Sequence, residues 1–419
     1  LPGTELFVLW ITNAREQRLS SRIFTQQENI EKWRVVKRLS KEERREFEEN
    51  FEEDFNSLMF EEEPGLKSSF AKDKLYPSFE TVEMSFDRTL EFRQAIFYAH
   101  EQMMRDIKKV LVFRRDFSGK KASHIINAIT DLFTSEKFER GRHTRIFENS
   151  FNERIGRVFA LGVSSGTSGL ELVLKAKFGS LAGKSIVVPA NANIADVTSV
   201  ISAGGNVVLA DVTNDDFSLD PEKLIKLLDD NAGELNIVGI IVVHMGGVIS
   251  RNIEQIQSIA KERGIFLVED ASHACGSMYK GAPAGSFGDA AVFSLYATKV
   301  LTSFSGGIIV TDDAKLFSKL YSYRMQGRVT ESRNEVYDTL GGNFEMNEIQ
   351  AIIAMADLAD LDERLIRRRA IAEIYDSYFC DIDGVEMLNV PECRSNYYKY
   401  VLIIDSEVYP YFVYNIIKV

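Results

Sequence analysis

Cysteine is scarce in this chain. Only Cys275, Cys380 and Cys393 occur in 419 residues, and no two of them have the spacing of a CxxC motif. Disulfide frameworks and thiolate metal sites need paired or closely spaced cysteines, so neither is predicted. The low and odd count is typical of a protein from a reduced, cytoplasmic compartment.

Histidine is equally sparse and shows no clustering. The five histidines are scattered along the chain, at His100, His124, His143, His244 and His273. Metal centres with nitrogen ligands need several such side chains at short, regular spacings. The sequence therefore predicts no metal site.

Long hydrophobic runs and an excess of positive charge are also missing. The longest apolar run, residues 237–248, is interrupted by His244 and three glycines, and it is too short to span a bilayer. Residues 6–12 are too few for the apolar core of a signal peptide. A formal net charge of −12 argues against nucleic acid and anionic membranes as partners. It leaves room for a local basic pocket.

The N-terminal part is charged and has helical periodicity. We interpret residues 1–120 as a helical region inserted ahead of the main domain. Within it, an apolar residue recurs every fourth position among glutamates and arginines, at Phe47, Phe51, Phe55 and Met59. This spacing predicts one apolar stripe on a helix. The stripe either packs on its own domain or docks another protein.

The pattern changes after residue 156. Short apolar runs predict strands at 158–163, 186–189, 207–212, 237–244, 265–269, 290–295 and 307–311. Helical periodicity between most of them predicts an α/β domain with a mainly parallel sheet covered on both faces. We assign this domain to residues 121–365 and expect a long helix over 347–379. Residues 366–419 would then begin a small C-terminal domain.

Lys299 and Asp270 lie where such a domain binds ligands, since each follows an apolar strand. A lysine that binds an aldehyde covalently and an acid that keeps a ring nitrogen protonated are what a pyridoxal-phosphate (PLP) enzyme requires. Asp270 could instead cap a helix, and a lone lysine usually lies in solvent. His273 could bond the cofactor's phenolic oxygen or simply pack in the interior.

A phosphate site is predicted at residues 164–169, which read SSGTSG between a strand and a helix. The backbone N–H groups at Gly166 and the hydroxyls of Thr167 and Ser168 suit an anion at a helix N-terminus. Ser294 could reach the same phosphate. Without further context, such a segment is usually only a turn.

Several segments in register resemble the DegT/DnrJ/EryC1/StrS family of fold type I PLP-dependent sugar aminotransferases. They include VSSGTSGLEL, VEDASHACGSMYKG, GSFGDAAVFSLYATKVLT and GGNFEMNEIQAIIAMADLADLDERL, and the resemblance covers roughly residues 138–380. It implies that Lys299 binds the PLP aldehyde, that Asp270 contacts the ring nitrogen, and that His273 lies near the ring. It also implies that Ser294, Thr167 and Ser168 bind the phosphate.

The resemblance adds two asparagines to the cofactor site and implies a homodimer. Asn193 stands where many members stack an aromatic residue on the ring. Asn343 matches an asparagine that reaches the phosphate of the neighbouring subunit, so active sites would be shared. Glu345 stands where an arginine is usual, and Phe304-Ser305 replaces a glycine–glutamate pair.

The resulting expectation is an aminotransferase that moves an amino group from an amino acid, glutamate, to a nucleotide-linked keto sugar. One alternative is a PLP-dependent sugar dehydratase, but those relatives carry histidine at the position of Lys299. The other is a non-catalytic paralogue with a binding or regulatory role, which Asn193, Glu345 and the short C-terminus would suit. The identity of the sugar, the nucleotide and the aminated carbon is not encoded in any recognisable motif.

Overall fold

The computed structural model describes residues 6–11, 119–134, 141–231, 234–329 and 336–405. These residues belong to two compact units. The larger unit contains the described residues of 115–377 and 386–402, and the smaller contains those of 1–114, 378–385 and 403–419. The predicted stripe of Phe47, Phe51, Phe55 and Met59 lies outside the described residues.

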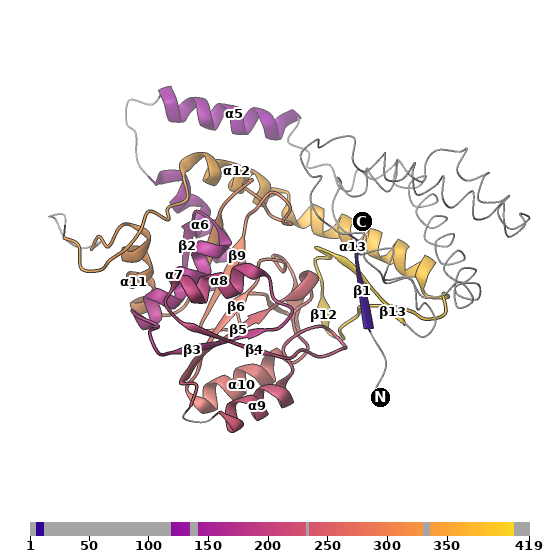
Figure 1. Cartoon of the computed structure of the whole chain (residues 1–419). Coiled ribbons are helices and arrows are strands. Elements are labelled where there is room, and N and C mark those ends of the chain that lie inside the picture. Colours follow the sequence, from indigo (N-terminus) through magenta and orange to yellow (C-terminus); the bar gives the residue numbers. More distant parts are fainter. Residues whose placement is uncertain (1–5, 12–118, 135–140, 232–233, 330–335, 406–419) are drawn as a thin grey trace, which may run out of the picture. The chain divides into compact units, whose positions relative to one another are not determined.

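A seven-stranded sheet forms the centre of the larger unit (Figure 1). Its spatial order is β2-β10-β9-β6-β5-β3-β4, and only β10 runs antiparallel to its neighbours. The strands are β2 (Phe159–Val163), β3 (Ser185–Pro189), β4 (Asn206–Ala210), β5 (Ile237–Val243), β6 (Phe266–Asp270), β9 (Ala290–Ser294) and β10 (Gly307–Thr311). The prediction of a mainly parallel sheet is confirmed, and each predicted strand is found within two residues of its expected bounds.

Burial explains why the central strands are nearly continuous apolar runs. Every residue of β3, β6 and β10 is buried. A parallel strand covered on both faces cannot alternate polar and apolar residues, because both sets of side chains lie in the core. The edge strand β4 is partly exposed, as its position predicts.

Helices cover both faces of the sheet. The chain order, with right-handed crossovers, places α8 (Ile194–Ser202) on one face and α9 (Pro221–Asp230) with α10 (Ile253–Arg263) on the other. The helix α7 (Gly166–Phe178) packs beside α8. Two further helices, α6 (Arg142–Ile155) and α11 (Ala314–Arg324), contact β2, whereas α5 (Gly119–Thr134) contacts the helix Glu348–Ala359.

The expected long helix at 347–379 is instead two helices, α12 (Glu348–Ala359) and α13 (Leu361–Phe379). The break falls at Asp360, which adopts a non-helical conformation as the C-cap of α12. A capping box between Asn347 and Gln350 fixes the start of α12. Sequence periodicity misses the break because the apolar spacing continues through it.

Two smaller sheets complete the described elements. One has the order β12-β7-β8 and contains Cys393–Arg394, Met278–Tyr279 and Ala282–Pro283. The other has the order β1-β13-β11, with strands Leu6–Ile11, Tyr400–Asp405 and Val385–Met387. None of the helices in the described ranges is both long enough and apolar enough to cross a membrane.

Candidate active site

Lys299 and Asp270 come together at the carboxyl ends of neighbouring strands. Asp270 is the last residue of β6 and is buried, and Lys299 lies in the turn that follows β9. Burial lowers the pKa of Lys299, and the carboxylates of Asp270 and Asp196 only partly offset this effect. A lysine with a lowered pKa has more of the neutral amine that attacks an aldehyde.

Asp270 also acts as a local cap, which was the alternative role considered for it. Its Oδ1 accepts a hydrogen bond from the backbone N–H of Ser272 at 2.9 Å. This contact uses one carboxylate oxygen and fixes the orientation of the group. It leaves the second oxygen for a partner in the site.

Asp196 is a residue of this cluster that the sequence analysis missed. It lies in the first turn of α8 and is fully buried. Among the described residues, no N–H or O–H group donates to either of its carboxylate oxygens. Burial and the charge of nearby Asp270 raise the pKa of Asp196 to about 9. A carboxyl group with this pKa is protonated at neutral pH.

An aromatic platform lies beside the lysine. The ring of Tyr398 stacks on that of His273 with a centroid distance of 4.4 Å. The Nζ of Lys299 lies 5.0 Å from the centroid of the Tyr398 ring, and the Tyr398 hydroxyl lies 3.3 Å from Oγ1 of Thr298. No motif marked Tyr398 in the sequence; the only signal was its place in the aromatic run NYYKY.

His273 is neutral in this environment. Burial lowers its pKa to about 3, and the charges of Lys299 and Lys399 act in the same direction. Its Nδ1 is buried and has no hydrogen-bond partner within the described part of the chain. Such a nitrogen is costly to bury unless a ligand completes its bonding. The predicted position of His273 near a bound ring is compatible with this orphaned atom.

The segment that carries Tyr398 is tied firmly to the loop after β6. The side-chain amide of Asn396 donates to the carbonyl oxygens of His273 and Cys275 at 2.8 and 2.9 Å. The guanidinium of Arg368 donates to the Tyr397 carbonyl oxygen at 3.1 Å. The stacked pair of His273 and Tyr398 is therefore held by two independent anchors.

The predicted phosphate site is built as a helix N-terminus. Ser165 and Ser168 form a capping box, so the Ser168 hydroxyl is engaged in holding the start of α7. The N–H groups of Gly166 and Thr167 open the helix and have no intrahelical acceptor. Ser294 lies close by, since a Cβ added to Gly166 would come within 3.0 Å of the Ser294 Cβ. This close approach explains the glycine.

Asn193 and Asn343 are less closely tied to the cluster. Asn193 is exposed and caps α8, with its Oδ1 accepting from the Ala195 N–H at 2.9 Å. Asn343 is exposed and lines a cleft of about 1510 Å³, together with Phe304 and Glu345. Lys299 does not line that cleft.

The cluster has the chemistry that PLP requires. Lys299 has an amine that could bind the aldehyde, and Asp270 has a carboxylate that could pair with the ring nitrogen. The orphaned Nδ1 of His273 and the open N–H groups at the start of α7 provide further bonding for a ring with a phosphate. The residues present therefore fit the cofactor.

Comparison with known proteins agrees with this chemistry. The model of the DegT/DnrJ/EryC1/StrS aminotransferase family matches residues 120–411. GDP-perosamine synthase of Escherichia coli O157:H7 is 31% identical over 269 residues, which are 64% of this chain and 71% of that protein. Spore coat polysaccharide biosynthesis protein SpsC of Bacillus subtilis is 30% identical, over 67% of this chain and 73% of its own length.

Solved structures show the same fold. Helicobacter pylori PseC, an aminotransferase involved in the biosynthesis of pseudoaminic acid, superposes with a TM-score of 0.63 at 25% identity. The match covers 68% of this chain and 76% of PseC. S. venezuelae DesV gives a TM-score of 0.61 at 27% identity, over 72% and 76% of the two chains. The chain therefore belongs to the DegT/DnrJ/EryC1/StrS aminotransferase family, whose members are PLP-dependent enzymes of fold type I.

Proposed function

We propose that this enzyme transfers an amino group from glutamate to a keto sugar carried by a nucleotide. The observation that carries the proposal is the cluster of Lys299, Asp270 and His273 at the carboxyl ends of β6 and β9. When bound, PLP draws electrons away from the carbon that bears the amino group, which lets that carbon lose a proton.

Lys299 has two tasks in this proposal. Its neutral amine binds the cofactor aldehyde, and after the donor amine displaces it, the same group moves a proton at the substrate carbon. The lowered pKa of Lys299 serves both tasks, because a base must be unprotonated to accept a proton.

Asp270 and Asp196 act on the ring nitrogen as a pair. The Asp270 carboxylate stabilises a protonated nitrogen, since opposite charges favour each other's ionised state. The protonated carboxyl of Asp196 donates toward Asp270 and orients it. Neutral His273 adds no positive charge near the nitrogen, because its pKa is about 3.

The sugar and the nucleotide rest on the relatives. GDP-perosamine synthase and UDP-4-amino-4,6-dideoxy-N-acetyl-beta-L-altrosamine transaminase carry nucleotide sugars in their names. A third relative, L-glutamine:scyllo-inosose aminotransferase, acts on a cyclic ketone without a nucleotide in its name. The last two names describe transaminases. A sugar-like ring is therefore the substrate class proposed for this enzyme, with the cytosol as its compartment.

A homodimer with shared sites is part of the proposal. Asn343 lies in a cleft away from Lys299 of the same chain. A two-fold related copy would let Asn343 serve the phosphate of the neighbouring site, and an isologous interface forms two such sites at once.

The direct test is to load the purified full chain with PLP and add glutamate. The proposal predicts loss of the visible absorption band and appearance of the amine form of the cofactor, with 2-oxoglutarate released in equal amount. Adding a nucleotide-linked keto sugar should restore the original band. Unchanged spectra with glutamate, glutamine and alanine would contradict an aminotransferase function.

A further inference from the structure

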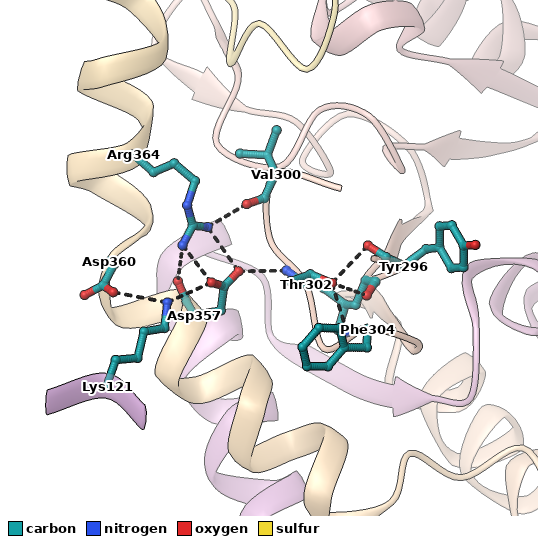
Figure 2. A network of polar contacts seen from close by, with 9 residues as sticks. Lys121, Tyr296, Val300, Thr302, Phe304, Asp357, Asp360 and Arg364 are labelled. Atoms are coloured by element: carbon teal, nitrogen blue, oxygen red, sulfur yellow. Dashed lines mark hydrogen bonds and ion pairs between the residues drawn. The ribbon is translucent and has the colours of Figure 1, made fainter. Parts of the chain in front are cut away.

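A buried carboxylate on α12 contacts the turn that carries Lys299. The Asp357 side chain is 1% exposed and accepts a hydrogen bond from the Thr302 backbone N–H at 2.9 Å. Figure 2 shows this contact in a network of polar groups drawn from α5, α12, α13 and the lysine turn. Asp357 lies within the segment GGNFEMNEIQAIIAMADLADLDERL, but the sequence analysis gave it no role.

Two cations make this burial tolerable. The Nζ of Lys121, on α5, lies 2.9 Å from Oδ1 of Asp357. The guanidinium of Arg364, on α13, donates to both carboxylate oxygens, at 2.7 and 3.0 Å. A buried carboxylate is costly unless it is paired and fully hydrogen-bonded, and here both conditions hold. Asp357 is therefore a fixed point with little freedom to move.

Arg364 adds a second contact to the same turn. Its Nη1 also donates to the Val300 carbonyl oxygen at 2.6 Å (Figure 2). Val300 directly follows Lys299 in the chain. The network thus contacts the backbone on the C-terminal side of the lysine at two places, Val300 and Thr302.

Thr302 then closes the turn upon itself. Its hydroxyl donates to the carbonyl oxygens of Leu295 and Tyr296, both at 3.0 Å, and accepts from the Phe304 N–H at 2.9 Å. The Tyr296 carbonyl oxygen also accepts from the Lys299 N–H at 2.9 Å. One residue therefore joins the two ends of the turn, and Asp357 fixes that residue to α12.

We propose that Asp357 is a positioning residue for Lys299, which it orients through Thr302 and, with Arg364, through Val300. The proposal rests on the proposed function, in which Lys299 binds the PLP aldehyde. A rigid backbone on both sides of the lysine holds its amine where the aldehyde arrives, which is how enzymes lower the entropic cost of a covalent step. Without the anchor, the turn samples other conformations and the amine is misplaced.

The test measures how fast PLP combines with the full-length apoprotein, followed by the visible absorption of the lysine-bound cofactor. Asp357→Ala should slow this rate at least tenfold at a temperature where circular dichroism shows the variant folded. Asp357→Asn keeps an oxygen acceptor for the Thr302 N–H, so it should recover most of the rate. A purely structural role would lower the melting temperature and leave the rate unchanged.

Two further variants complete the design. Arg364→Met removes the Val300 contact and retains the Lys121–Asp357 pair, so it should slow the rate several-fold even if Asp357→Ala does not fold. Asp362→Asn is the matched control. Asp362 lies on the same helix as Arg364, and its ion pair with Arg154 does not involve the lysine turn. This control should react at the wild-type rate.

Wild-type rates in both Asp357→Ala and Arg364→Met, or in Arg364→Met when Asp357→Ala does not fold, would overturn the positioning role. So would equal slowing of the test variants and the Asp362→Asn control. Borohydride reduction of the wild-type protein separates this failure from that of the proposed function. An adduct on a residue other than Lys299 refutes the proposed function and the inference together. An adduct on Lys299 with wild-type rates in the variants refutes the inference alone.

Discussion

The carboxyl group of Asp196 lies near that of Asp270 at the carboxyl ends of β3 and β6, and the charge of Asp270 helps to keep Asp196 protonated. Asp196 belongs to the first turn of α8, and Asp270 ends β6. Both side chains are buried, and the pKa of Asp196 is raised to about 9 by burial and by its neighbour. Lys299 lies close enough to this pair for both groups to oppose the lowering of its pKa by burial. The pair thus combines the protonated carboxyl group of Asp196 with the carboxylate of Asp270, which can pair with a protonated ring nitrogen.

The raised pKa of Asp196 makes the apoprotein less stable at high pH. The folded-state pKa of Asp196 lies above its unfolded value of 3.8, so its contribution is complete below that value and is lost as pH rises through about 9. Asp196→Asn keeps a donor toward Asp270 and cannot ionise. We expect this variant to be more stable than wild type by at least about 1 kcal/mol at pH 9, with no gain at pH 4.

Urea unfolding of the apoprotein between pH 4 and pH 9 checks this expectation. Asp196→Ala is the control, because it cannot ionise and also cannot donate toward Asp270. It should bind PLP roughly tenfold more weakly than Asp196→Asn. A wild-type stability that rises steadily from pH 4 to pH 9 relative to Asp196→Asn would show that Asp196 is not protonated in the folded protein.

Asp270→Asn separates the two roles of this residue. Asparagine keeps the oxygen that accepts from the Ser272 N–H, so the local cap and the fold should persist. It cannot hold a positive charge on the ring nitrogen, so transamination should fall by about 10³-fold or more while PLP still binds. Steady-state rates, with cofactor occupancy measured in parallel, test this prediction. Near-normal turnover would show that Asp270 acts only as a local cap.

A second buried polar pair, His244 and Glu269, contributes to the stability of β6. The Nε2 of His244 lies 2.8 Å from Oε2 of Glu269, and both side chains are fully buried. Burial favours the neutral acid, but bonds from His244 and from backbone N–H groups outweigh it and lower the pKa of Glu269. The backbone donors are those of Gly285, Phe287 and Gly288.

Glu269→Gln should therefore cost about 2 kcal/mol or more of unfolding free energy at pH 7. A lowered folded pKa gives stability that is present above the unfolded value of 4.5 and is lost as pH falls through the folded pKa. The difference between variant and wild type should shrink below pH 4. Chemical denaturation at both pH values measures it, and a difference that is the same at both would contradict the assignment.

Shared sites can be tested by mixing two defective chains, Lys299→Ala and Asn343→Ala. In a mixed dimer with shared sites, one site carries both defects and the other carries neither. Random exchange of equal amounts should restore about a quarter of wild-type activity, since half the dimers are mixed and each has one intact site. Activity that never exceeds the mean of the two parents would show that each chain builds its own site.

The sheet and the lysine turn could be predicted from the sequence because their signals are local. An uninterrupted run such as Ile237–Val243 can only be a buried strand or a buried helix segment, and its length decides for a strand. Asp270 and Lys299 could be found because each follows such a strand. The resemblance to a known family supplied their roles.

The residues that were missed act through contacts that are distant in the chain. Asp196 lies more than seventy residues before Asp270 in the chain. Its place in the first turn of a helix gave no signal, because acidic residues are favoured there in any helix. Tyr398 reaches His273 only through the return of the chain after α13. Asp357 depends on Lys121 from α5. No periodicity encodes such tertiary partners.

The central claim is that Lys299 binds the PLP aldehyde, and one measurement tests it most directly. The full-length protein is loaded with PLP, reduced with borohydride, digested and mapped by mass spectrometry. We expect a single pyridoxyl modification on the peptide that contains Lys299, and none in Lys299→Ala. Modification of another lysine, or no modification of a chain that binds PLP, would contradict it.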